Sequence, residues 1–370
     1  MGASMKYFMQ DLWRRFTGNR RALFFGYVLL FVALALLPFL LSNTVGRTWV
    51  RILDFALIYA MLALGLNIVV GFAGLLDLGY IAFYAVGAYT WALLASPQFD
   101  LHLPFWAILP IGAGMAALFG VLLGAPTLRL RGDYLAIVTL GFGEIIRIFL
   151  NNLDHPVNVT NGPIGINKID PISIGGADLT KTHELLGIVF SGVHIYYYVL
   201  LILLFLTIVI CVRLEKSRIG RAWLAIREDE LAAQAMGINT RNVKLLAFAL
   251  GAMFGGVAGG LFASLQGFVS PESFGLLESI MVLCMVVLGG MGHVYGVLLG
   301  ALLLTVLPEI LRSTASPIQR TLFGEVYIDP EALRMLLFGL ALILVMLVRP
   351  TGLWPAPKRR TVIDQDIVED

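Results

Sequence analysis

Charged residues are scarce in this chain of 370 residues. They make up 14% of it, against roughly 25% in a typical soluble domain, while 59% of the residues are hydrophobic. Mean hydropathy is +0.86, and the formal net charge is +2. A buried core cannot absorb this excess, because a soluble globule of this size still needs a polar surface. The composition therefore excludes a soluble enzyme, a disordered chain and a nucleic-acid-binding protein, and it indicates a protein embedded in lipid.

Cysteines and catalytic motifs are scarce too. The two cysteines, Cys211 and Cys284, lie in apolar runs, so neither a disulfide framework nor a metal site is expected. The chain has no Gly-x-x-x-x-Gly-Lys-Ser/Thr phosphate loop, and the glycine-rich residues 255–260 lack the lysine. No catalytic triad or metal-ligand spacing is present. We therefore expect no catalytic residue, no metal and no cofactor bound by this chain, and hence no enzyme.

Ten apolar segments are present instead, and they predict an all-α, polytopic membrane protein with a single membrane domain over residues 1–370. Helices are expected because backbone groups in lipid must be satisfied within the segment. The first segment follows five basic residues in 1–21 and is long enough to span, which argues against a cleavable signal. Because glycines interrupt 278–311, nine crossings or a re-entrant piece remain alternatives to ten. The segments are 22–41, 52–70, 79–96, 104–125, 134–150, 195–212, 244–266, 278–288, 293–311 and 331–348.

The distribution of Lys and Arg predicts the orientation. Residues 213–244 hold seven basic residues, whereas the polar stretch 151–194 holds only Lys168 and Lys181. Cytoplasmic loops carry the excess of positive charge, so 213–243 is a predicted cytoplasmic loop and 151–194 a predicted external loop. Residues 1–21, the turn at Arg129 and Arg131, and the tail 356–370 then also lie in the cytoplasm. Both termini are predicted to be cytoplasmic.

Glycines recur at intervals of four residues and predict close helix packing. Small residues at this spacing let membrane helices approach each other, with a pore lining as the alternative interpretation. The rows are Gly251, Gly255 and Gly259; Gly256 and Gly260; Gly112, Ala116, Gly120 and Gly124; and Gly292, Gly296 and Gly300.

Two glycine clusters, at 71–74 and 289–292, are predicted to break helices. Broken helices at matching places in two halves of a chain often mark a transport path. We therefore expect these two breaks to face each other near a path.

Few charges lie within the apolar segments. Glu144 and Arg147 are three residues apart and can pair on one helix face. Asp54, Glu278 and Glu309 lie near the ends of segments, where we expect water at the membrane interface to solvate their carboxyl groups. A dense set of carboxylates and histidines is missing, which weakens an ion-coupled carrier as the alternative.

The cytoplasmic residues 221–236 are predicted to form one helix, because they are rich in Ala, Leu, Arg and Glu. Gly237 suits the left-handed residue that ends a helix, and Asn239 or Thr240 can cap the next one. A solvated linker is the simple interpretation. The tight join to both flanking spans favours a lever that transmits force from a soluble partner.

This stretch resembles the coupling loop of ABC importer permeases, since ELAAQAMG at 230–237 is similar to their Glu-Ala-Ala…Gly signature. From about residue 50 to 355 the chain resembles the LivM-type permeases of branched-chain amino-acid importers. The shared motifs are GLNIVVG at 65–71, LRLRGDYLAIVTLGFGE at 128–144, GRAW at 220–223, REDE at 227–230, QGFVSPES at 266–273 and VLGGMG at 287–292.

The resemblance implies a subunit of a bacterial inner-membrane importer for leucine, isoleucine or valine. A second related permease, two cytoplasmic ATPases holding ATP and magnesium, and a substrate-binding protein outside the membrane would complete it. Urea, short-chain amides and other amino acids remain alternative substrates within the family. The residues expected to couple the chain to the ATPases are Arg221, Arg227, Glu228, Asp229, Glu230, Ala233 and Gly237. The residues expected along the path are Asn67, Gly71, Gly74, Gly141, Gly143, Glu144, Gly289, Gly290 and Gly292.

Overall fold

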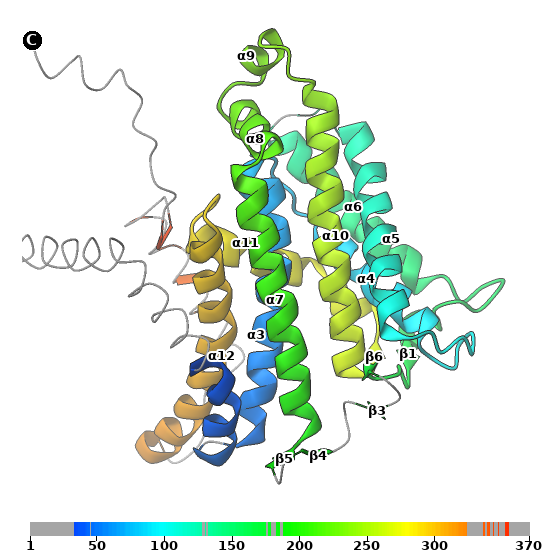
Figure 1. The fold of residues 1–370 in the computed structure, drawn as a ribbon, viewed down its shortest axis with the longest axis vertical. Coiled ribbons are helices and arrows are strands. Elements are labelled where there is room, and N and C mark those ends of the chain that lie inside the picture. The colour runs from blue at the N-terminus through cyan, green and yellow to red at the C-terminus, as the bar shows by residue number, and fades with distance from the viewer. Residues whose placement is uncertain are drawn as a thin grey trace, which may run out of the picture.

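Long helices running side by side dominate the computed structural model (Figure 1). It describes residues 33–44, 46–127, 130, 132–174, 177–178, 183–185 and 188–323, with a few single positions between 336 and 354. Four helices in this part are long and apolar enough to cross a membrane, namely Arg47–Phe72, Phe105–Thr127, Gly192–Lys216 and Thr240–Gln266. They coincide with four predicted spans, and the chain is accordingly an all-helical, multi-pass membrane protein.

The helices follow the predicted order. Ala33–Thr44 is followed by α3 (Arg47–Leu66), the wide-turn helix η1 (Asn67–Phe72), α4 (Ile81–Leu94), α5 (Phe105–Thr127) and α6 (Asp133–Asn151). After the polar stretch come α7 (Gly192–Lys216), α8 (Arg218–Glu228), α9 (Glu230–Ala235), α10 (Thr240–Gln266), α11 (Leu276–Gly289) and α12 (Val294–Phe323). The predicted spans 22–41 and 331–348 lie mostly outside the described residues. So do Arg129, Arg131, and the tail 356–370.

Two of the predicted spans are short helices. Both α4 and α11 have 14 residues, fewer than the roughly 20 that cross a bilayer as a helix. Residues 73–80 lead into α4 as a non-helical connector, most of which is buried, although Gly74 is exposed. The 3-10 turn η3 (Pro271–Phe274) leads into α11. Non-helical backbone at membrane depth is tolerated only where protein or a water-filled cavity covers it.

The helix α10 packs against α3, α4 and α5, and the glycine rows allow this close approach. A Cβ at Gly251 would lie 2.5 Å from Val69 Cγ2 of η1, and one at Gly256 would lie 2.8 Å from the Gly112 carbonyl oxygen of α5. The row of Gly292, Gly296 and Gly300 also brings helices close together, because Gly296 and Gly300 of α12 lie against α11. The prediction that these rows serve close packing is therefore confirmed.

Short antiparallel strands lie at the end of the helices opposite α8 and α9 (Figure 1). β1 (Ile166–Asn167) pairs with β6 (Phe268–Val269), which follows α10 directly. The pairs β2 (Ser173–Ile174) with β3 (Ala177–Asp178), and β4 (His183–Leu185) with β5 (Ile188–Phe190), fall within the predicted external loop. The pairing of β1 with β6 thus attaches this stretch to the end of α10.

One expectation about charge is wrong. Asp54 of α3 was expected at a solvated interface, but its side chain is fully buried. Neither carboxyl oxygen has a hydrogen-bond partner in the described part of the chain. The helix begins at Arg47, five residues before the apolar segment at 52–70, so Asp54 lies two turns inside it.

Candidate functional site

The predicted cytoplasmic helix 221–236 is two helices rather than one. α8 ends at Glu228, and Asp229 adopts an extended conformation with φ −153° and ψ 113°. Its carboxylate then caps α9 by accepting hydrogen bonds from the amides of Leu231 at 2.8 Å and Ala232 at 3.1 Å. Asp is a strong helix-capping residue, and this preference outweighs the helix-forming residues around it. Gly237 ends the segment with φ +82°, as predicted.

The segment is attached firmly to the membrane helices. Trp223 of α8 is fully buried, stacks on Phe72 at a ring distance of 6.5 Å, and donates from Nε1 to the Val243 carbonyl at 2.8 Å. Glu230 of α9 accepts from Lys244 Nζ at 2.6 Å, and the Lys244 side chain is only 6% exposed. Both contacts reach the first turn of α10. α8 and α9 are therefore each joined to the start of α10 by a side-chain contact.

The two glycine breaks contact each other. The side-chain oxygen of Asn67, at the start of η1, accepts a hydrogen bond of 2.9 Å from the Gly292 amide. A Cβ at Gly71 would lie 2.5 Å from the same amide nitrogen, so only glycine permits this approach. The two hydrogen-bonded residues, Asn67 and Gly292, are 225 positions apart in the sequence. The expectation that the breaks face each other is confirmed in its geometry.

Arg227 of α8 reaches the junction of these two breaks. Its Nη1 donates to the Gly71 carbonyl. A Cβ at Gly74 would lie 2.7 Å from Arg227 Cγ, and one at Gly292 would lie 3.0 Å from Arg227 Nη1. The guanidinium thus lies where three glycines leave room for it. One predicted coupling residue and four predicted path residues form a single cluster, which we call the break junction: Asn67, Gly71, Gly74, Arg227 and Gly292.

The other predicted coupling residues lie on α8 and α9 or directly beside them. Arg221, Glu228 and Asp229 are exposed, and Ala233 is a buried residue of α9. Arg221 donates to the Lys216 carbonyl at 3.2 Å, which is contact within its own segment.

The remaining predicted path residues divide into two groups. Gly289 lies in close contact with Gly296, and Gly290 adopts φ +120° next to the break junction. Gly143 and Glu144 lie elsewhere, on α6. Gly141 faces open space, with no atom within 4 Å of a Cβ built there, and it joins neither group.

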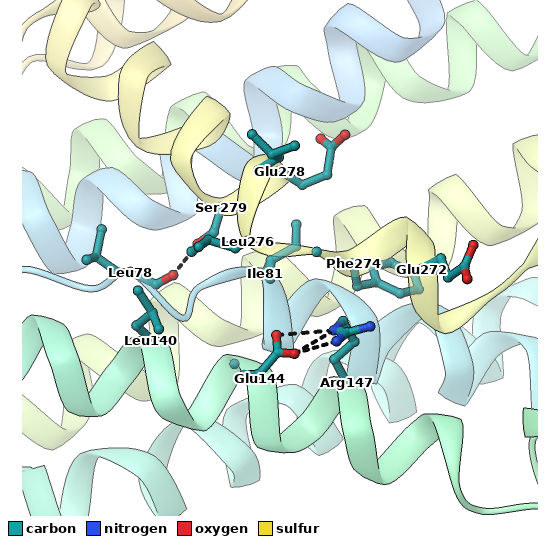
Figure 2. A pocket seen from close by; sticks show the side chains of 13 residues that line it. Leu78, Ile81, Leu140, Glu144, Arg147, Glu272, Phe274, Leu276, Glu278 and Ser279 are labelled. Carbon is teal, nitrogen blue, oxygen red and sulfur yellow. Dashed lines mark hydrogen bonds and ion pairs between the residues drawn. The ribbon is translucent and has the colours of Figure 1, made fainter. Parts of the chain in front are cut away.

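A cleft of about 700 Å³ lies between α6, the start of α4, η3 and α11 (Figure 2). Gly79 of the 73–80 connector lies against α6. The Leu78 amide donates a hydrogen bond of 3.0 Å to Thr139 Oγ1 and so holds the connector against the same helix. Ser279 of α11 donates to the Leu78 carbonyl, so the connector joins both walls. The cleft is lined by Leu78, Ile81, Leu140, Gly143, Glu144, Arg147, Glu272, Phe274, Gly275, Leu276, Leu277, Glu278 and Ser279.

The predicted ion pair of Glu144 and Arg147 lies in this cleft, as Figure 2 shows. Arg147 Nε lies 3.1 Å from both carboxylate oxygens of Glu144, and Nη2 donates to the same group. Glu272 and Glu278 line the opposite wall, but in Figure 2 their carboxylates point away from the ion pair, and Glu278 accepts from the Tyr59 hydroxyl at 3.0 Å. In the described ranges, no three His, Cys, Asp or Glu side chains come together as a metal site.

Sequence reasoning missed several of these residues. Trp223 lies in the motif GRAW, and a large aromatic residue in an otherwise charged helix is a sequence signal of a buried contact. Glu278 was assigned to a solvated segment end. Its place opposite Glu144 depends on a contact between elements more than 130 positions apart, which periodicity does not reveal.

Comparison with known proteins agrees with these features. A family model described as the permease component of branched-chain amino acid transport systems matches residues 48–346. The chain is 44% identical over 339 residues to LivM, a high-affinity branched-chain amino acid transport system permease protein of Escherichia coli, with 88% of this chain and 75% of that one covered.

Two further relatives share the same printed function. BraD of Pseudomonas aeruginosa is 30% identical over 307 residues, covering 81% of this chain and 92% of the relative. LivH of Escherichia coli is 27% identical over 305 residues, with the same shares covered. No solved structure matches the chain.

Proposed function

The chain belongs to the family of permease components of branched-chain amino acid transport systems, and we propose that it carries leucine, isoleucine and valine across the bacterial inner membrane into the cytoplasm. ATP, with magnesium, is hydrolysed by separate ATPase subunits, and this chain supplies the membrane path. The observation that carries the mechanism is Arg227, whose side chain extends from the exposed helix α8 to the break junction.

The exposed side of α8 and α9 is the proposed ATPase contact. Arg221, Glu228 and Asp229 offer charge to a soluble partner, while Trp223 and Lys244 hold the segment against the membrane helices. When ATP binding closes the ATPases, α8 moves, and α10 moves with it as a rigid body. Arg227 applies the same motion to η1 and to the start of α12.

The partner set follows from the family and from the similarity to LivH. A second, related permease completes the path, two ATPases dock on the cytoplasmic side, and a binding protein delivers the substrate from outside. In this arrangement the chain crosses the membrane ten times with both termini in the cytoplasm. Support comes from the seven basic residues in 213–244 and from the strands at the opposite end of the helices.

Uptake of labelled leucine in cells with and without this chain tests the proposal, with urea as competitor. We expect leucine uptake to depend on the chain and on ATP, and urea to leave it unchanged. Unchanged leucine uptake together with lost urea uptake would assign the chain to a urea permease instead. ATP-independent uptake would support the ion-coupled carrier.

Gly237→Arg tests the coupling segment. An arginine at φ +82° is strained, and its side chain would project beside α9. We expect normal membrane insertion, continued ATP hydrolysis and lost leucine uptake, and Glu230→Gln should act in the same direction because it breaks the ion pair with Lys244. Normal uptake by Gly237→Arg would count against the lever.

A further inference from the structure

The cleft between α6 and α11 takes no part in the coupling contacts described above. Its volume of about 700 Å³ falls in the range of roughly 300–1,000 Å³ that small-molecule sites occupy. It combines the ion pair of Glu144 and Arg147 with two further carboxyl groups, Glu272 and Glu278. Such a concentration of charge within membrane helices points to a function.

The position of the ion pair excludes a lipid-facing role. Glu144 lies seven residues before the end of α6 at Asn151, which is roughly 10 Å along the helix axis. The side chains of Glu144 and Arg147 are 42% and 32% exposed, so neither is sealed in the protein. The neighbouring side chains Ile145 and Leu277 are exposed and apolar. Charges within membrane helices are expected to face water or protein rather than lipid, and the partial exposure of this pair leaves room for such contact in the cleft.

The guanidinium of Arg147 has hydrogen-bonding capacity to spare. Nε and Nη2 bind Glu144, whereas Nη1 makes no hydrogen bond within the described residues. A guanidinium binds a carboxylate through two parallel donors. Glu144 is the carboxylate that contacts Arg147, and its side chain is 42% exposed, so it can also accept a hydrogen bond from a cationic group.

We infer that this cleft receives an apolar amino acid as a zwitterion during transport, with its carboxylate at Arg147 and its ammonium at Glu144. The apolar side chain then lies against Leu140 and Phe274, which line the cleft. Because the zwitterion carries no net charge, its binding does not change the net charge of the cleft. This inference rests on the proposed function, because it names the groups that handle the transported amino acid.

A zwitterionic lipid headgroup carries the same two charges, and the experiment separates the two sources. The complete transporter is reconstituted with Cys211→Ala, Cys284→Ala and Leu277→Cys, which places one thiol at the rim of the cleft. The rate of labelling by a water-soluble maleimide is measured with leucine, isocaproate, isopentylamine or glycerophosphoethanolamine. Isocaproate lacks the ammonium and isopentylamine lacks the carboxylate.

We expect leucine at ten times its dissociation constant to slow labelling about tenfold, and the other three compounds to have little effect. Arg147→Gln should remove the protection, and Ile145→Ala, on the same helix but outside the cleft lining, should retain it. Equal protection by isocaproate or isopentylamine, protection by glycerophosphoethanolamine alone, protection that survives Arg147→Gln, or no labelling at all would overturn the inference.

A charge exchange provides a second measurement. Glu144→Arg combined with Arg147→Glu preserves an ion pair, so a purely structural pair would leave leucine uptake near normal. If Glu144 and Arg147 recognise the two charged groups of the substrate at fixed positions, leucine uptake should fall at least about tenfold, because each substrate group then meets the wrong charge. Leucine uptake by the unmodified transporter tests the proposed function separately. Normal uptake there without protection in the cleft would refute this inference alone.

Discussion

Replacing Arg227 by glutamine tests the contact between the cytoplasmic segment and the membrane path. The change removes the guanidinium that donates to the Gly71 carbonyl, while Trp223 and Lys244 still hold α8 and α9 in place. Hydrogen bonds to charged groups contribute about 1.5–3 kcal/mol. Because Arg227 is partly exposed, the lower end of this range applies, which corresponds to about a tenfold change in the equilibrium between linked and unlinked positions.

The assay measures ATP hydrolysis and leucine uptake together in proteoliposomes that contain the complete transporter. We expect Arg227→Gln to lower the number of leucine molecules carried per ATP about tenfold, with the rate of hydrolysis largely retained. Arg227→Lys should recover part of the loss, since it keeps the charge but has a shorter reach. Arg218→Gln is the matched control, because Arg218 is exposed in the first turn of the same helix. Unchanged leucine transport per ATP in Arg227→Gln would refute the role of the break junction in coupling.

Three further predictions concern stability. Gly79→Ala should lower the amount of folded protein in the membrane, since the new Cβ would lie 1.8 Å from a backbone oxygen of α6, whereas Gly141→Ala should leave it unchanged. Asp54→Asn should not lower the thermal unfolding temperature, because the buried carboxyl group has no hydrogen-bond partner in the described residues; a clear decrease would contradict this reasoning. The hydrogen bond to Asp170 raises the pKa of His102, so this contact stabilises the external loop at acidic pH and is lost as the pH rises through that raised pKa. Limited proteolysis of 151–194 should therefore become faster with rising pH, and His102→Gln should remove the pH dependence.

The sequence predicted features that depend on neighbours along one helix. The spacing of Gly251, Gly255 and Gly259 predicted close packing, since residues four apart share a helix face. The pairing of Glu144 with Arg147 was predictable for the same reason. Features that depend on contacts between distant elements were less accessible. Arg227 was assigned to the ATPase contact alone, and its place in the break junction arises only because η1 and α12 meet beneath α8.

Local competition explains the other differences. The residues around Asp229 favour a continuous helix, but its carboxylate gains two hydrogen bonds by capping α9. Asp54 lies near the end of an apolar run, and the run was taken as the helix. The helix in fact begins earlier, at Arg47, and carries Asp54 into the interior. Apolar runs therefore located the helices more reliably than they located helix ends.

The two short helices α4 and α11 leave part of the bilayer thickness to non-helical chain. α4 and α11 have 14 residues each and are therefore about 21 Å long, against a hydrocarbon thickness of about 30 Å. Around the cleft, the remaining thickness is filled by the 73–80 connector and η3 rather than by continuous helix. Under the proposed transport function, we expect the ATPases to act on these non-helical segments rather than on a full-length helix, so each power stroke can be short.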